Sequence, residues 1–247
     1  MRLLLINPNT TQAVTDRLLA TARAVAAPGT DIVPLTATRG VPYISSRAEA
    51  QIGGAQLLEM LAEHAAGADA AILACFGDPG LLAARELFDL PVIGMSEAAM
   101  LTACMLGRRF AVVTFAAALG PWFEECVEMH GLRARSAGTR CLDGAFRDIA
   151  EVAEEKEALL VALASRAVEE DGAEVVILGG APLAGLAPRV ADRVPVPLVD
   201  PVAAAVKQAE ALVALAPRKP RAGSFARPAG KPSIELHPAL AARIAGG

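Results

Sequence analysis

The sequence has few aromatic residues, no large net charge and no long uninterrupted hydrophobic run, and each shortage excludes a class of function. Aromatic residues make up 4% of the 247 residues and the net charge is −4. A basic stripe interleaved with aromatic side chains, on which nucleic-acid bases would stack, is therefore missing. The hydrophobic runs end, or meet a charge, before the ~18 residues of a membrane span. The N-terminal run turns polar at Asn7-Pro8, too early for a signal peptide. We expect a soluble, cytoplasmic protein that binds a small molecule and neither nucleic acid nor membrane.

Cysteine and histidine are also scarce and scattered. There are three histidines and four cysteines, and the cysteines form no C-x-x-C pair: Cys75, Cys104, Cys126 and Cys141. This pattern fits reduced thiols better than a disulfide framework or a zinc site, so we predict no metal. His64 and His130 fall at the predicted ends of helices, where histidine interacts favourably with the helix dipole. Neither histidine is predicted to be catalytic.

The hydrophobic residues, 54% of the chain, are enough for a large core. Short β-branched runs alternate with alanine-rich or amphipathic stretches, a pattern typical of βαβ units in a mainly parallel sheet. Strands are predicted near 2–6, 30–34, 70–74, 91–94, 109–114, 132–136, 174–178 and 196–199. Helices are predicted at 11–27, 47–65, 79–88, 96–106, 120–130, 146–170, 184–192 and 201–215. The predicted fold class is α/β.

The order of these elements repeats along the chain, because strand, unusual loop and helix occur at 70–88 and again at 174–192. We therefore predict two pseudo-symmetric lobes, each a mainly parallel sheet flanked by helices. Residues 1–96 plus about 200–215 are assigned to the first lobe and 97–199 to the second. The proline-rich, basic segment 216–247 is predicted to be an extended tail lying on a surface.

Ligands of open α/β sheets bind outside the carboxyl ends of the strands, so the loops that follow the strands are the candidate sites. After the first strand, Thr10 or Thr11 can cap the next helix, but the two asparagines exceed what one cap needs. We expect Asn7 or Asn9 to contact a ligand. Thr114, at the end of another strand, can donate to a substrate carbonyl or serve as a local cap.

Cys75 has a different position from the other cysteines. A buried free cysteine is commonly a small hydrophobic residue, the role assigned to Cys104. Cys75 instead ends a strand, beside Gly77 and before Asp78-Pro79, which resemble the N-cap and first residue of a helix. Backbone N–H groups and the helix dipole there would favour the thiolate. Cys75 is therefore the predicted acid/base, whereas the matching strand in the second half ends in glycine.

These motifs resemble the aspartate/glutamate/hydantoin racemase superfamily, and within it the hydantoin and allantoin racemases. The resemblance rests on four segments: Ile6-Asn7-Pro8-Asn9-Thr10, Ala74-Cys75-Phe76-Gly77-Asp78-Pro79-Gly80-Leu81, Pro91-Val92-Ile93-Gly94-Met95-Ser96-Glu97-Ala98-Ala99, and the residues around Leu178-Gly179. It implies two α/β lobes with the active site in the cleft between them. It also implies proton transfer at the carbon next to a carbonyl by two cysteines, one from each lobe, with no metal or organic cofactor.

The chain departs from this pattern in the second lobe. Cys75 matches the first cysteine, but the second is expected in Leu-Gly-Cys-Ala-Gly, and this chain has Leu178-Gly179-Gly180-Ala181-Pro182. Gly180 would thus replace the second cysteine, and Pro182 lacks an N–H for a developing oxyanion. Three interpretations stay open: a racemase-like isomerase working through Cys75, a one-cysteine decarboxylase, lyase or cis-trans isomerase of the same superfamily, and a non-catalytic descendant that binds a small ligand.

The remaining predicted substrate-binding residues lie in three loops: Tyr43 and Ser45, then Phe76, Gly77 and Asp78, then Gly180, Ala181 and Pro182. For the first loop the alternative is a capped helix start, with Ser46 as N-cap and Glu49 completing a capping box. Arg47 is the only nearby cation, so a neutral ring such as a 5-substituted hydantoin suits the site better than a dicarboxylate. Because superfamily members are commonly oligomers, we also expect a homo-oligomer.

Overall fold

The computed structural model describes residues 1–143 and 145–246 and contains two four-stranded sheets. The strand orders are β2-β1-β3-β4 and β6-β5-β7-β8, so the second sheet repeats the first with each number raised by four. Every one of these neighbouring strand pairs is parallel. The predicted α/β class with two similar halves is confirmed. We call the half built on β1–β4 the first lobe and the half built on β5–β8 the second lobe.

The elements of both lobes follow in chain order. The first lobe contains β1 (Arg2–Asn7), α1 (Gln12–Val25), β2 (Asp31–Thr36), α2 (Arg47–His64), β3 (Ala70–Leu73), α3 (Leu81–Leu87) and β4 (Val92–Gly94). The second lobe contains β5 (Phe110–Thr114), α5 (Gly120–Met129), β6 (Ser136–Cys141), α6 (Val152–Glu155), α7 (Glu157–Asp171), β7 (Val175–Leu178), α8 (Leu186–Val190) and β8 (Leu198–Val199). All residues of β3, β5 and β7 are buried, because helices cover both faces of each sheet.

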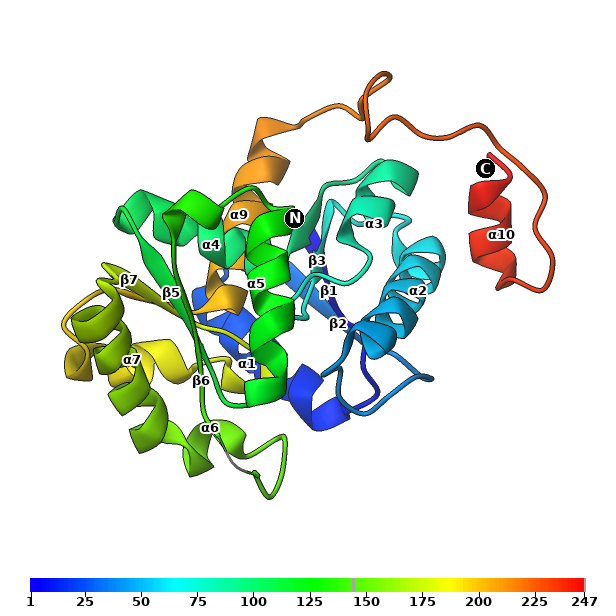
Figure 1. The fold of residues 1–247 in the computed structure, drawn as a ribbon. Coiled ribbons are helices and arrows are strands. Elements are labelled where there is room, and N and C mark those ends of the chain that lie inside the picture. Colours follow the sequence, from blue (N-terminus) through cyan, green and yellow to red (C-terminus); the bar gives the residue numbers. More distant parts are fainter. Residues whose placement is uncertain (144, 247) are drawn as a thin grey trace.

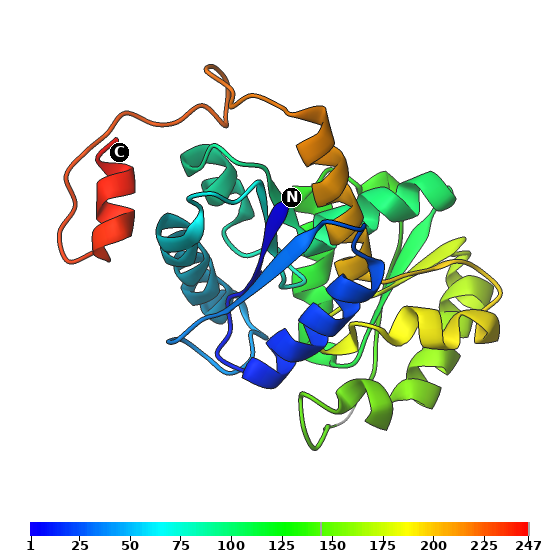
Figure 2. The same ribbon diagram turned by 180° about the vertical axis from the view of Figure 1, so that it is seen from behind.

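Two helices lie between the sheets. α4 (Met95–Leu106) and α9 (Pro201–Leu215) pack against each other. Figures 1 and 2 show them between the two lobes. α9 also contacts α1, β3 and β4, so the chain returns to the first lobe after completing the second. The loops after β3 and β7 are thereby held near the junction of the lobes.

Several predicted element boundaries are wrong, and the strand predicted at 132–136 differs most. Arg133–Arg135 form a 3₁₀ turn, and the strand follows it as β6. β6 is a partly exposed edge strand of sequence SAGTRC, which carries almost no hydrophobic pattern to predict it. The single helix predicted at 146–170 is two helices, α6 and α7, separated at Lys156.

The tail is extended only in part. Residues 216–237 contain neither helix nor strand, but Pro238–Ile244 form a seven-residue helix, α10, that contacts α2. The Lys219 ammonium donates to the carbonyls of Glu86 at 2.8 Å and Phe88 at 2.9 Å, at the end of α3. The tail therefore runs along the first lobe (Figure 1). Gly247 lies outside the described residues. Among the described helices, none has the length and hydrophobicity needed to cross a membrane.

Candidate active site

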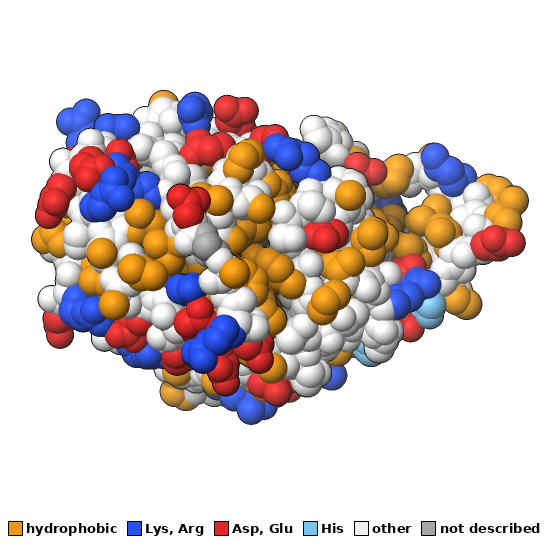
Figure 3. Space-filling view, turned by 60° about the horizontal axis from the view of Figure 1, so that its bottom comes forward, with side chains coloured by type: hydrophobic (Ala, Val, Ile, Leu, Met, Phe, Trp, Pro, Cys, Tyr) orange, Lys and Arg blue, Asp and Glu red, His pale blue; other side chains and the backbone are white. Residues whose placement is uncertain are grey.

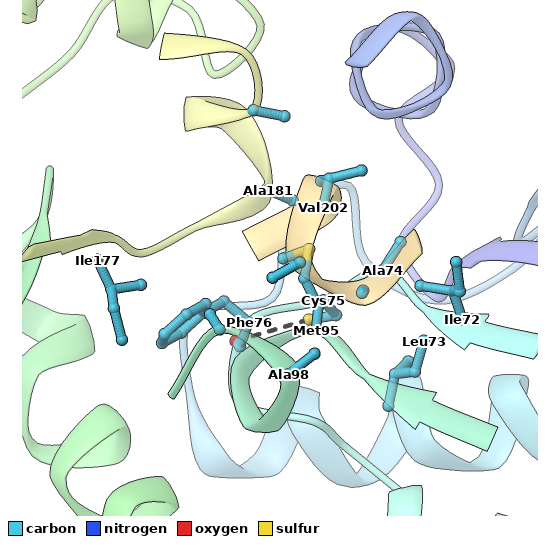
Figure 4. Packing of buried hydrophobic residues seen from close by; sticks show 14 of the residues in the cluster. Ile72, Leu73, Ala74, Cys75, Phe76, Met95, Ala98, Ile177, Ala181 and Val202 are labelled. Atoms are coloured by element: carbon cyan, nitrogen blue, oxygen red, sulfur yellow. Dashed lines mark hydrogen bonds between the residues drawn. The ribbon is translucent and has the colours of Figure 1, made fainter. Parts of the chain in front are cut away.

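The loops that follow β3 and β7 meet at the junction of the lobes. A Cβ atom added to Gly179 would lie 3.3 Å from the ring of Phe76, so the second loop packs directly against the first. Cys75 is 7% exposed. Figure 4 shows it directly after β3, among Met95, Ala98 and Val202 from α4 and α9. The predicted acid/base thus lies where both lobes contribute to its surroundings.

The surroundings of the Cys75 thiol oppose the thiolate that the sequence predicts. Burial raises the pKa of Cys75 far above its usual value, and the charges of Asp78 and Cys126 raise it further. The helix that should favour the thiolate begins only at Leu81, after Gly80 with φ of 81°. The Cys75 Sγ instead lies 3.9 Å from the Phe76 carbonyl oxygen. Cys75 therefore holds its proton unless its surroundings change.

Asp78 caps a different helix from the one predicted. Its carboxylate accepts hydrogen bonds from the N–H groups of Ser96 at 3.0 Å and Glu97 at 2.8 Å, in the first turn of α4. A Cβ atom at Gly94 would lie 2.4 Å from the Asp78 Oδ2, so only glycine permits this approach. Asp78 thus ties the Cys75 loop to α4 and is not the N-cap of α3.

One face of α5 covers the Cys75 loop. Trp122, Cys126 and the following His130 are spaced four residues apart and therefore share one side of the helix. A Cβ atom at Gly77 would lie 2.4 Å from Trp122 Cζ2, and the Phe76 ring is 4.6 Å from the ring of Phe123. A helix of the second lobe therefore forms the wall behind a loop of the first.

His130 is the functional candidate that the sequence reasoning missed. Its Nε2 lies 3.2 Å from the Asp78 Oδ2 and its Nδ1 lies 3.4 Å from the Glu97 Oε1. Burial alone would lower the pKa of His130, but its hydrogen bonds with Asp78, Cys126 and Glu97 raise it to about 11. His130 was set aside because no strand-end loop is near it in sequence. The four-residue spacing with Trp122 and Cys126 is the signal that places it on the same face.

Among the described residues, one group of side chains could hold a metal ion. It consists of Asp78, Cys126 and His130, whose ligand atoms lie within 4.8 Å of one another. These side chains are already used in hydrogen bonds: both Asp78 oxygens accept from the backbone of α4, and the Cys126 Sγ lies 3.1 Å from the Ser96 Oγ. We therefore assign the group to hydrogen bonding and assign no metal ligands.

Thr114 has the geometry of a substrate donor. Its side chain is completely buried, and its Oγ1 has no hydrogen-bond partner among the described residues. A Cβ atom at Gly180 would lie 3.8 Å from this oxygen, so the hydroxyl lies beside the second loop. Buried polar groups are almost always paired in native proteins. An unpaired buried hydroxyl at this position is expected where a ligand supplies the missing hydrogen-bond partner.

The second loop has neither a thiol nor space for one. Gly180 has φ of 126°, and a Cβ atom there would lie 2.9 Å from the Phe115 Cε1. The Phe115 ring stands 5.9 Å from that of Tyr43 and 5.5 Å from that of Phe146, forming an aromatic wall. Pro182 lies in a short 3₁₀ turn, Ala181–Leu183. This side of the site is therefore apolar.

The backbone donors of the two loops also differ. In the first loop the Gly77 N–H donates to Ser96 Oγ at 3.3 Å and the Asp78 N–H to the Cys75 carbonyl at 3.1 Å. These two groups, predicted to face the substrate, are used within the protein. For the N–H groups of Gly180 and Ala181, no hydrogen bond is found among the described residues. The second loop keeps the free donors.

Asn7 is fully engaged in its own loop. Its amide nitrogen donates to Asn9 Oδ1 and Thr15 Oγ1, each at 3.0 Å, and its Oδ1 accepts from the Asn9 N–H at 3.2 Å. The Asn9 Oδ1 also accepts from the Thr11 N–H at 2.9 Å. Asn7 therefore shapes the loop, and of the two asparagines Asn9 keeps an amide nitrogen with no hydrogen bond among the described residues.

The 40–47 loop combines a helix cap with one candidate contact. Ser46 is the N-cap of α2 and accepts from the Glu49 N–H at 3.3 Å, as predicted. The Glu49 carboxylate accepts from the Ser45 N–H at 2.7 Å, so the cap reading also accounts for Ser45. Tyr43 is half-buried, and burial raises the pKa of its hydroxyl. Its ring stands 5.9 Å from that of Phe115, beside the second loop.

The cation nearest to these loops is already paired. The Arg47 Nε lies 2.9 and 3.0 Å from the two carboxylate oxygens of Glu125, on α5. Seen from the edge at which the strands end, hydrophobic side chains gather in the middle of the molecule with charged groups beside them (Figure 3). The candidate site thus offers donors and apolar surface more than charge.

Comparison with known proteins supports the resemblance. The sequence profile described as Asp/Glu/Hydantoin racemase matches residues 3–209. A hydantoin racemase of Paenarthrobacter aurescens is 36% identical over 236 residues, which cover 94% of this chain and 99% of that one. An allantoin racemase from Klebsiella pneumoniae has a TM-score of 0.89 and 36% identity, with coverages of 97% and 98%. An allantoin racemase from Pseudomonas fluorescens has a TM-score of 0.88 and 35% identity, with coverages of 95% and 100%. The chain therefore belongs to the Asp/Glu/Hydantoin racemase family.

Proposed function

We propose that the chain is a cofactor-independent enzyme of the hydantoin-racemase type. In this proposal Cys75 removes and returns the proton at the carbon next to a carbonyl of a hydantoin or a related amino-acid derivative. The observation that carries it is the place of Cys75 in a loop whose Phe76 packs against Gly179 of the second loop, together with the buried Thr114 hydroxyl beside Gly180, which has no hydrogen-bond partner among the described residues. One group can hold the proton, and the other can donate to the carbonyl oxygen that gains charge.

The chemistry requires an enolate to be stabilised while the proton is on the enzyme. Thr114, the Asn9 amide and the N–H groups of Gly180 and Ala181 are the donors proposed for the enolate oxygen. Cys75 must ionise before it can act as a base. Because its thiol is buried and neutral, we expect the rate of exchange to rise with pH in the alkaline range.

Two features support a neutral substrate with an apolar substituent. Arg47 is paired with Glu125, so it is not free to hold a substrate carboxylate. The rings of Tyr43, Phe115 and Phe146 offer apolar surface on the side of Gly180. A hydantoin with an aromatic group at C5 satisfies both conditions. We then propose that four residues shape the site rather than bind the ring: Asn7, Gly77, Asp78 and Pro182. Ser45 and Phe76 are proposed to line the site.

A second reaction is favoured by the same neutral thiol. A one-cysteine decarboxylase needs a proton donor, because loss of CO₂ leaves a carbanion that the enzyme must protonate. Burial raises the pKa of Cys75, which favours the thiol form that such a donor needs. A disubstituted malonate would be the corresponding substrate class.

The first test is proton NMR of enantiopure 5-benzylhydantoin in deuterated water, with the native protein, Cys75→Ala and Cys104→Ala. We expect deuterium to enter C5 with the native protein and with Cys104→Ala, which removes a thiol outside the site. Cys75→Ala should lose at least a hundredfold in rate, the typical contribution of a general base being about 10²–10⁴-fold. Exchange that survives Cys75→Ala would contradict the assignment.

Absence of exchange would direct the test to the alternatives. Release of CO₂ from a disubstituted malonate would support the decarboxylase, and binding without turnover of either compound would support a ligand-binding protein. The cytoplasmic location, the homo-oligomeric state and the division of the chain at 96 and 200 stay predictions.

A further inference from the structure

His130 reaches from the second lobe into the space behind the Cys75 loop. It follows the last residue of α5, and its side chain is 4% exposed. The groups that face it are Asp78 from the loop, Glu97 from α4 and Cys126 from α5. His130 therefore contacts the Cys75 loop through Asp78.

The charges around His130 form two pairs. Arg85, on α3, binds Glu97 with its Nη1 2.9 Å from the Glu97 Oε1. Burial opposes the ionisation of Glu97, but hydrogen bonds from His130 and Arg85 lower its pKa to about 2. Glu97 thus faces both Arg85 and His130, whereas His130 is the side-chain cation that faces Asp78 among the described residues. Without it, the Asp78 carboxylate would keep only the two backbone N–H groups of α4 as partners.

We propose that His130 is a positioning residue for Cys75: as a cation held against Asp78, it fixes the loop that carries the thiol and balances the carboxylate charge of that loop. This deepens the proposed function and rests on the role of Cys75 in it. Because His130 comes from the second lobe, docking of the two lobes completes the surroundings of a group in the first. The same face of α5 supplies Trp122 against Gly77 and Cys126 against Ser96.

The test measures Cys75 directly rather than turnover. The native protein and its variants are treated with iodoacetamide across a pH series, and alkylation of the peptide containing Cys75 is followed by mass spectrometry. Only the thiolate reacts, so below its midpoint the rate reports the ionised fraction. This readout gives an answer even if hydantoins are not the substrates, and so separates this proposal from the proposed function.

Two variants should shift the reaction in opposite directions. His130→Gln keeps a hydrogen-bonding side chain but removes the cation. We expect alkylation of Cys75 to slow about tenfold at a fixed pH, which corresponds to a shift of the alkylation midpoint by about one pH unit upward. Asp78→Asn removes the opposing charge, and asparagine tolerates its φ of 49°. We expect alkylation about tenfold faster. His64→Gln, at an exposed histidine of α2, is the control and should change nothing.

Several outcomes would overturn the proposal. Equal midpoints in all variants would leave His130 with no effect on Cys75, and shifts of the same sign would indicate general loosening of the loop. If His130→Gln does not fold, His130→Lys restores a cation, and a native midpoint is then expected. Stoichiometric binding of Zn²⁺ by the native protein, lost in His130→Gln, would also contradict the proposal.

Discussion

The loops after β3 and β7 hold equivalent places in two sheets of the same strand order, yet they have different tasks. The first carries a thiol, uses its Gly77 and Asp78 N–H groups internally, and is covered by α5. The second carries Gly180, whose N–H and that of Ala181 have no hydrogen bond among the described residues, and it faces the Phe115 ring. A repeated backbone can therefore keep its geometry while its two copies carry different side chains, and in the proposed function one copy holds the proton and the other supplies donors.

The largest effect expected from this comparison concerns the glycine of the first loop. Gly77 has φ of 111°, and a Cβ atom there would overlap the Trp122 ring at 2.4 Å. Gly77→Ala should lose about 1–3 kcal/mol of unfolding free energy from strain and about 1–3 kcal/mol more from overpacking. Gly138→Ala is the matched control, since its φ is 118° and nothing lies within 4 Å. Equal losses in urea unfolding would show that α5 does not press on the loop.

The next effect concerns the donor beside the second loop. Thr114→Val keeps the shape of the side chain and removes a hydroxyl that has no partner among the described residues. Stability should stay within about 0.5 kcal/mol, whereas deuterium exchange should slow about a hundredfold, as for loss of one oxyanion donor. An unchanged exchange rate would remove Thr114 from the site. A large loss of stability would show that its hydroxyl has a structural role instead.

The smallest effect tests why the second loop carries glycine. Gly180→Ala adds a Cβ atom 2.9 Å from the Phe115 Cε1, and Phe115→Leu removes that ring. Both single variants should be less stable than the native protein. The loss of unfolding free energy in the double variant should be smaller than the sum of the two single losses by about 1 kcal/mol, as expected for residues in contact. Strict additivity would mean that Phe115 does not limit the space at Gly180.

The sequence predicted the parts of the site that depend on local order. Thr114 ends a buried hydrophobic strand and Cys75 follows one, so local order is enough to propose both, and the Ser46 cap is confirmed because N-caps have a local signature. The role of His130 depends on how α5 packs across another lobe, which no local pattern states. The rise in the pKa of Cys75 is hidden from the sequence for the same reason, since burial is a property of the assembled fold. The internal hydrogen bonds of Asn7 were also hidden in side-chain geometry.

The most direct test of the account is deuterium exchange measured separately on the two pure enantiomers of 5-benzylhydantoin, with optical rotation followed in the same samples and protein-free solutions as the baseline. In the proposed function Cys75 acts from one side and Gly180 offers no acid/base on the other, so we predict that one enantiomer exchanges at C5 much faster than it loses rotation. The other enantiomer should exchange at least about tenfold more slowly. Equal exchange of both enantiomers, each matched by loss of rotation, would show an acid/base on each face and contradict the account.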